Sequence, residues 1–373
     1  MQLDFLLDEK IYGRLDQLSD PLAKLDAIMD WSAFVSIIDE VRPDKTKRGV
    51  GGRPPISSLI MFKGLLIGEI YHLSDYQIEY QITDRASFKR FCGIKLGEKA
   101  PDANSFWLLR EALKETGKYD DLFNVLFEVL EDVGLVYSKC AIVDATFVDA
   151  PRNRSIKKEQ REILKERSHN PEVEVPFEID LTQHEALESH LPEVERVMSH
   201  KLRQTDVDAM WAKKGEEVHY GYKDHVVVDS ITKLIIAHEV TPANIADVTK
   251  LVDVVPEDTE RVYDDAGYVG EEVDQKLKEK CPHIEHFTCK KGQRNKPLTQ
   301  KQKDHNREKV SRTRARVEHV FGYMTYCMGG LCIRSIGIAR AKCKQTLRDL
   351  AYNIMRYATL ENKRKKKALQ MAS

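Results

Sequence analysis

The sequence predicts an α/β protein whose first third is entirely helical, and three observations support this prediction. Apolar residues recur at spacings of three and four between residues 21 and 133, which is typical of amphipathic helices. A run rich in β-branched residues follows at 141–150, and alternating apolar residues at 218–240 indicate two strands joined by a turn. We therefore expect an all-α domain over residues 1–133, an α/β domain over 134–360 and a basic tail over 361–373, in which the run at 363–367 is expected to be disordered.

The composition is that of an ordinary soluble protein with two or three domains. The chain has 373 residues, of which 42% are hydrophobic and 32% are charged. It contains no apolar run of about 18 residues, and its N-terminus lacks the basic start of a signal peptide, so no membrane association and a cytoplasmic location are expected. Its seven cysteines are scattered without a C-x-x-C pair, which favours reduced thiols over a disulfide framework.

The net charge of −1 conceals a strongly basic C-terminal quarter. Residues 290–373 carry 22 Lys and Arg against 5 Asp and Glu, a local charge of +17, which leaves −18 for the rest. An isolated basic run is most often a solvated face. Here the basic residues surround candidate acidic ligands, which favours a nucleic-acid partner.

The first 133 residues contain a series of short helices. The predicted helices lie at about 21–41, 56–71, 75–82, 87–91, 106–113 and 122–133, whereas residues 1–20 are weakly patterned. The basic, glycine-rich segment 42–53 is expected to form a mobile loop. Short helices with tight turns are typical of helix-turn-helix DNA-binding domains, but a helical bundle without a DNA role fits the same pattern.

The rest of the chain alternates strands and helices around a charged insertion. The expected order is a strand at 141–150, the insertion at about 151–210, a hairpin at 218–229 and 234–240, a helix at 244–254, a strand at 261–263, a helix at 271–280, a strand at 283–289, a long helix from 299 to 328 and a last helix at 339–360. Without the insertion, three consecutive strands, a helix and a fourth strand remain. This order predicts a ribonuclease-H-like fold with a helical insertion.

Three acidic residues occupy positions that such a fold brings together. Asp144 lies in the middle of the first strand, where an unpaired charge is costly. Because the first and fourth strands are neighbours, Asp265 at the end of the fourth strand can approach it, and Glu318 can reach both from its helix. Carboxylates are hard ligands for Mg²⁺ or Mn²⁺, and two such ions support phosphoryl transfer on DNA. A single aspartate at a strand end is more often a turn cap, but three in this order favour catalysis.

Neighbouring acidic residues are expected to lie outside this site. Strand alternation points Asp264 away from Asp265, and Asp149 away from Asp144. Asp206 and Asp208 fit a capping role better than a ligand role. The Cys and His residues at 281–289 do not have the spacing of a zinc site.

The sequence resembles the bacterial insertion-sequence DDE transposases of the large family numbered five. The motifs that carry the resemblance are Gly52-Arg53-Pro54-Pro55 and Asp84-Arg85-Ala86-Ser87-Phe88 in the helical part, Val143-Asp144-Ala145-Thr146, Thr205-Asp206-Val207-Asp208-Ala209 with Lys213-Lys214-Gly215, Asp265-Ala266-Gly267-Tyr268, and Arg316-Val317-Glu318-His319-Val320-Phe321-Gly322. The resemblance implies an enzyme that binds the terminal inverted repeats of its element, cleaves them and joins them to target DNA. It also implies a homodimer on double-stranded DNA.

The DNA contacts are predicted from basic residues near these motifs. Many members of the family carry a lysine seven residues after the glutamate, but this chain has Thr325 there. The candidates are instead Arg312, Arg314, Arg316, Lys213 and Lys214, and the helical spacing of the three arginines means that only some of them can face DNA.

Two other functions fit the same sequence. The first is a DNA-binding regulator derived from a transposase but without catalysis, which the complete set of three acidic residues argues against. The second is a metal-dependent nuclease of the same fold that cleaves DNA without strand transfer.

Overall fold

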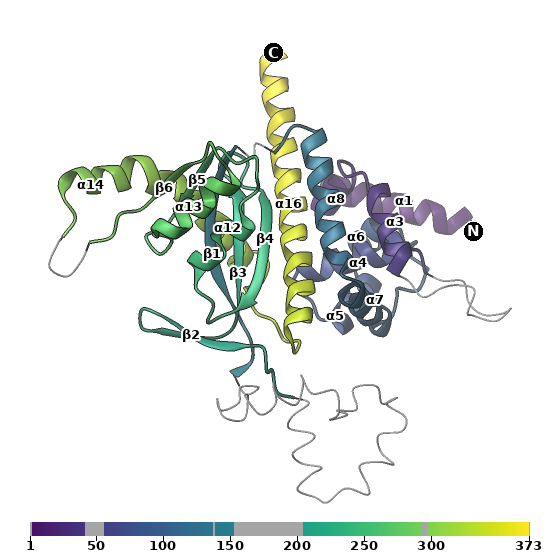
Figure 1. Ribbon diagram of the computed structural model, residues 1–373. Coiled ribbons are helices and arrows are strands. Elements are labelled where there is room, and N and C mark those ends of the chain that lie inside the picture. The colour runs from purple at the N-terminus through teal and green to yellow at the C-terminus, as the bar shows by residue number, and fades with distance from the viewer. Residues whose placement is uncertain (1, 42–55, 137–138, 153–203, 293–296, 373) are drawn as a thin grey trace, which may run out of the picture.

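The protein is a mixed sheet and a helical bundle packed on opposite sides of one long helix (Figure 1). The computed structural model describes residues 2–41, 56–136, 139–152, 204–292 and 297–372. The helices before the sheet are α1 (Gln2–Gln17), α2 (Pro21–Asp26), α3 (Ser32–Val41), α4 (Ser58–Ile70), α5 (Asp75–Asp84), α6 (Ala86–Cys92), α7 (Ala103–Thr116) and α8 (Lys118–Asp132). No helix in these ranges is both long and apolar enough to cross a membrane.

The remaining elements form the sheet and its covering helices. The strands are β1 (Cys140–Asp149), β2 (Met210–Lys214), β3 (Glu217–Asp229), β4 (Ile235–Pro242), β5 (Arg261–Asp264) and β6 (Glu285–Thr288). The helices are η3 (Asp247–Thr249), α12 (Leu251–Val254), α13 (Glu271–Lys280), α14 (Gln300–His305), the π-helical turn η4 (Asn306–Ser311), α15 (Arg312–Tyr326) and α16 (Ile338–Ala372).

The sheet has the strand order of a ribonuclease-H-like fold, which confirms the predicted fold class. β4, β3, β1, β5 and β6 are neighbours in that order, and β2 pairs with the first half of β3. β1 is antiparallel to β3, with Asp144 opposite Val226, and parallel to β5, with Ile142 opposite Tyr263. The parallel pairing places the end of β5 beside the middle of β1.

The two faces of β1 pack against different helices, because alternate side chains point to opposite sides of a strand. Ala141 and Val143 belong to a core that is completed by Leu251 of α12 and Leu277 of α13. Ile142 belongs to the larger core on the opposite face, where α15 and α16 pack. Asp144 shares this second face, so it points toward α15.

The long helix α16 joins the sheet to the helical region. Leu347, Leu350 and Ile354 are fully or almost fully buried along it. The Asn353 amide donates to the Ile235 carbonyl at 2.7 Å and accepts from the Ile235 N–H at 2.9 Å, so it pairs with the edge of β4 as another strand would. One continuous core extends across the sheet, α16 and the N-terminal helices, so the expected boundary at residue 133 is a boundary along the chain and not a gap in packing.

The helical region is packed around α4, which is buried on nearly all sides as its sequence predicted. Gly64 allows this packing, because a Cβ there would lie 2.3 Å from the Phe106 ring of α7. Its buried Lys63 pairs with Asp26 of α2. A capping box formed by Ser74 and Gln77 is present at the start of α5.

Five predictions about the elements were wrong. The weakly patterned residues at the start form α1, which Arg90 of α6 holds through Asp16 at 2.6 Å. The predicted helix at 21–41 is two helices, since the chain turns between α2 and α3, where Trp31 donates its indole N–H to Asp26. The helix at 244–254 is shortened to η3 and α12. The strand β2 lies at the end of the expected insertion, where no strand was foreseen.

The fifth error concerns the basic tail, which continues α16 as a helix to Ala372. Residues 361–372 contain Lys, Arg, Ala, Leu and Gln without proline or glycine, so helix propensity extends the helix beyond its buried part. Arg364 also donates to the carbonyls of Val133 and Gly134. The predicted loop at 42–53 and most of the insertion, 153–203, lie outside the described residues.

The burial of α16 predicts how unequally its leucines contribute to stability. We expect Leu350→Ala to lower the free energy of unfolding by about 2–5 kcal/mol, because it leaves a cavity between the sheet and the helical region. Leu369→Ala removes the same atoms from a side chain that is 72% exposed on the same helix and should have almost no effect. Urea denaturation of both variants measures the difference, and equal losses would contradict the central position of α16.

Candidate active site

Asp144 provides a nearly buried carboxylate in the middle of the sheet. Its side chain is 13% exposed, and its Oδ1 accepts a hydrogen bond from the Ala145 N–H at 2.9 Å. Burial raises the pKa of Asp144 above its ordinary value, and the nearby Asp265 charge adds to the rise, while Arg314 opposes it. A strand that is paired on both sides holds this group in place.

Arg314 of α15 brings Asp144 and Asp265 together. Its Nη2 lies 3.0 Å from the Asp144 Oδ2 and 3.9 Å from the Asp265 Oδ2. Asp265 follows directly after β5, and its Oδ1 accepts a hydrogen bond from the Gly267 N–H at 2.6 Å, which turns the chain away from the sheet. Two carboxylates separated by 121 residues in the sequence therefore share one guanidinium group.

Asp264 points to the other side of β5. It is fully buried and accepts a hydrogen bond from the His286 ring, whose second nitrogen contacts Asp274 of α13. Burial alone would lower the pKa of His286, but its contacts with Asp264 and Asp274 raise it above the ordinary value. Asp264 thus fixes β6 and α13 against β5, and it is Asp265 that faces α15.

The third acidic residue, Glu318, lies on α15 four residues after Arg314. Val317, Val320 and Met324 are fully buried and anchor this helix on the core. Because residues four apart project from the same side of a helix, Glu318 extends from the side that carries Arg314. Glu318 is exposed and forms no ion pair with any of the described residues. The structure thus joins the two aspartates through Arg314 and leaves Glu318 on the adjacent turn.

Two family matches cover most of this architecture. Residues 9–112 match the family described as Transposase domain (DUF772), and residues 138–354, more than half of the chain, match the family described as Transposase DDE domain. The chain belongs to the DDE transposases. No solved structure matches it.

This family assignment establishes the chemistry of the DDE transposase. It is an enzyme that cleaves and transfers DNA, and it depends on divalent metal. The acidic residues fit such an ion, because Asp144 and Asp265 offer hard oxygen ligands from rigid neighbouring strands. The two carboxylates already attract the positive charge of Arg314. Their negative charges raise the pKa of Arg314, although burial of the guanidinium opposes the rise.

The predicted DNA contacts of the transposase lie in different surroundings. Arg314 is held by the aspartates, and Arg316 donates to the Ser230 carbonyl, so neither guanidinium points freely into solvent. The side chain of Arg312 lies outside the described residues. Lys213 and Lys214 are exposed near the tip of the β2–β3 hairpin, which projects beyond the body of the sheet (Figure 1).

The remaining acidic residues of the motifs have structural contacts. Asp206 is fully buried and accepts hydrogen bonds from the Tyr222 hydroxyl at 2.8 and 2.9 Å. Asp208 accepts from the Ile338 N–H at 2.9 Å and so caps the start of α16. Asp149 lies 3.1 Å from the His219 ring, away from Asp144. The role of Arg314 as the partner of the aspartates was missed, although its spacing of four from Glu318 placed it on the same helix face.

Substitutions of the adjacent Asp264 and Asp265 are expected to have different effects, one on stability and the other on activity. We expect Asp264→Ala to lower the free energy of unfolding by about 1–3 kcal/mol, because it leaves the buried His286 without its acceptor. The matched Asp265→Ala should change stability by less than about 0.5 kcal/mol but abolish DNA cleavage, because its side chain is partly exposed and faces Arg314. Thermal unfolding and a cleavage assay measure both effects. A stable, inactive Asp264→Ala would assign the metal ligand to Asp264 instead.

Proposed function

We propose that this transposase binds the terminal inverted repeats of its own element and joins them to target DNA, with Asp144, Asp265 and Glu318 as ligands of Mg²⁺. Mn²⁺ fits the same oxygen ligands. The observation that supports this proposal is the approach of Arg314 to both aspartates, because two carboxylates beside one guanidinium concentrate negative charge on the α15 face of the sheet. Glu318 is assigned as the third ligand because it lies one turn along the same helix.

Each residue has a distinct task in this proposal. Asp144, Asp265 and Glu318 would hold divalent ions, which would supply activation of the attacking oxygen, water for cleavage and a DNA 3′-hydroxyl for joining, and stabilisation of the leaving oxygen. Asp144 and Asp265 define the position of the reacting phosphate, because their strands are fixed by the sheet. Arg314 balances their charge in the free protein. Its guanidinium is suited to contact a phosphate oxygen of the DNA backbone when the carboxylates are neutralised by other cations.

We further propose that DNA lies along the basic surfaces beside this site. Lys213 and Lys214 on the β2–β3 hairpin and the exposed basic run at 363–367 of α16 provide positive charge at a distance from the aspartates. The N-terminal helices are proposed to recognise the repeats, as expected from their helix-turn-helix-like pattern. Two copies are proposed on DNA, since two ends must be joined.

Asp144 and Asp149 provide a matched pair of substitutions on one strand. We expect Asp144→Asn to retain binding to labelled duplexes from the DNA that flanks the coding region, but to abolish their cleavage with Mg²⁺. Asp149→Asn removes a carboxylate of the same strand that contacts His219, and its cleavage should remain. Gel shift and denaturing gels measure the two steps, and joined products distinguish a transposase from a simple nuclease. Cleavage by Asp144→Asn with Mg²⁺ would exclude this assignment.

The hairpin lysines should contribute to DNA affinity through counterion release. We expect Lys213→Ala with Lys214→Ala to weaken binding and to reduce the slope of log affinity against log salt by about 2, if both lysines contact phosphates. Lys276→Ala with Lys278→Ala removes the same charge from α13, on the sheet face opposite Asp144, and should leave the slope unchanged. Titrations at several salt concentrations test this, and equal effects of the two double variants would exclude the hairpin as a DNA contact.

A further inference from the structure

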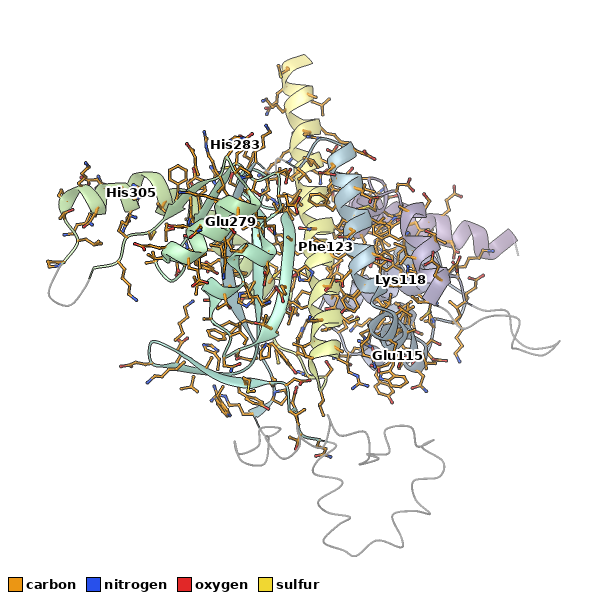
Figure 2. The ribbon with its side chains drawn as sticks, viewed as in Figure 1. Glu115, Lys118, Phe123, Glu279, His283 and His305 are labelled. Atoms are coloured by element: carbon orange, nitrogen blue, oxygen red, sulfur yellow. The ribbon has the colours of Figure 1, made fainter. Side chains whose placement is uncertain are left out.

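A second cluster of acidic and histidine side chains lies beneath α16. Asp224 of β3 and Asp349 of α16 are fully buried, and the side chain of His238 of β4 is 7% exposed. The three residues come from the elements that pack against one another at the centre of the molecule (Figure 1). Phe123, labelled in Figure 2 where α8 meets α16, covers the His238 ring with its centroid 4.9 Å away.

Three electron-pair donors of this cluster converge on one point. The His238 Nδ1 lies 3.2 Å from the Asp349 Oδ2 and 3.7 Å from the Asp224 Oδ1. All three atoms lie within 4.8 Å of one another. None of them has a hydrogen-bond partner among the described residues, although each has less than 1 Å² of exposed surface.

Gln345 holds the two carboxylates in this orientation. It is fully buried, and its Nε2 donates to the Asp224 Oδ2 at 2.9 Å and to the Asp349 Oδ1 at 3.0 Å. The oxygens that remain without a partner are the two that face His238. The Gln345 Oε1 is also buried without a partner, so the same amide offers a further oxygen beside the cluster. Such outer hydrogen bonds are typical of the groups that orient metal ligands.

The charges of the cluster are not balanced by the protein itself. Neither Asp224 nor Asp349 forms an ion pair with a lysine or arginine among the described residues. The adjacent Arg348 is directed elsewhere, to His72 and the Met328 carbonyl. Burial and the Asp224 charge raise the pKa of Asp349 well above its ordinary value, which shows how unfavourable two negative charges are at this point.

We propose that Asp224, His238 and Asp349 bind one divalent transition-metal ion, for which Zn²⁺ is the best match, apart from the catalytic aspartates. Ligand atoms bound at about 2.0–2.2 Å can be at most about 4.4 Å apart, and both measured distances to His238 fit within that limit. One imidazole and two carboxylates suit zinc, whereas Mg²⁺ and Ca²⁺ prefer oxygen ligands alone. An ion of charge +2 neutralises both carboxylates.

The ion has a structural role in this proposal. It connects β3 and β4 to α16 at the level where Phe123 of α8 covers His238. It therefore fastens the helical region to the sheet. Its residues differ from the aspartates at Arg314 in their partners, because Asp144 contacts Arg314 of α15 whereas Asp224 and Asp349 contact Gln345 of α16.

A similar group in the same chain provides the control. Asp264, His286 and Asp274 are the same three residue types, but both ring nitrogens of His286 contact carboxylate oxygens. Although the Asp264 Oδ1 has no hydrogen-bond partner among the described residues, the His286 ring has no free nitrogen to face a metal in the way that His238 does. Substitution of His286 should therefore leave the metal content unchanged.

The test uses the full chain with Asp144→Asn and Asp265→Asn, so that the catalytic pair contributes no bound metal. We expect elemental analysis after dialysis to find one equivalent of zinc per chain. Adding His238→Gln and Asp349→Asn should remove it, whereas adding His286→Gln should retain it. Retention of zinc after the His238 and Asp349 substitutions would overturn the proposal.

A second measurement requires no substitution in the cluster. The chain with Asp144→Asn and Asp265→Asn is treated with EDTA and reloaded with Zn²⁺ or Co²⁺. We expect the melting temperature to rise by several degrees on reloading, since the ion binds only the folded state, and Co²⁺ to give the visible absorption of a site with nitrogen and oxygen ligands. A chain that contains no stoichiometric metal and does not respond to either ion would overturn the proposal and leave a proton shared between the two carboxylates.

Discussion

The burial of α16 between the sheet and the N-terminal helices is the constraint on which the rest of the structure depends. Leu350 and Ile354 are fully buried, and Asn353 pairs with the backbone of β4. The start of the helix is fixed as well, because Asp208 from the segment before β2 caps it. The helical region and the sheet therefore share a core, which holds the N-terminal helices at a defined position relative to the aspartates.

Three buried aspartates of the sheet have different kinds of partner. Asp264 is neutralised by hydrogen bonds with His286, which fixes it as part of the structure. The charge of Asp144 is balanced by Arg314 of the helix α15, and a rotation of the arginine side chain can withdraw this cation. In the described part of the chain, Asp224 has no lysine or arginine partner, and its Oδ1 accepts no hydrogen bond. The partner of each carboxylate thus distinguishes Asp264, which has a structural role, from Asp144 and Asp224, which are available to an ion.

The fold could be predicted from the sequence because each strand has a clear local pattern and the strand order permits few topologies. The approach of Asp265 to Asp144 followed from that order alone, since the first and fourth strands of such a sheet are neighbours. The cluster at His238 could not be predicted in this way. Its members come from three separate elements. In the sequence of each element, a single polar residue indicates only a half-exposed position. The helical end of α16 was missed for another reason, because charge density alone does not distinguish a helix from a disordered tail.

The π-helical turn η4 explains how α15 packs on the core and brings Arg314 to the two aspartates. A π turn adds a residue to one helical turn, which rotates the residues that follow around the axis. α14 before the turn carries no buried residue, whereas Val317 and Val320 after it are fully buried. The rotation therefore allows the second half of the helix to pack on the core while Arg314, near the start of α15, reaches both aspartates. β1 and the end of β5 position the two aspartates, and the phase of α15 sets where Arg314 contacts them and leaves Glu318 on the next turn.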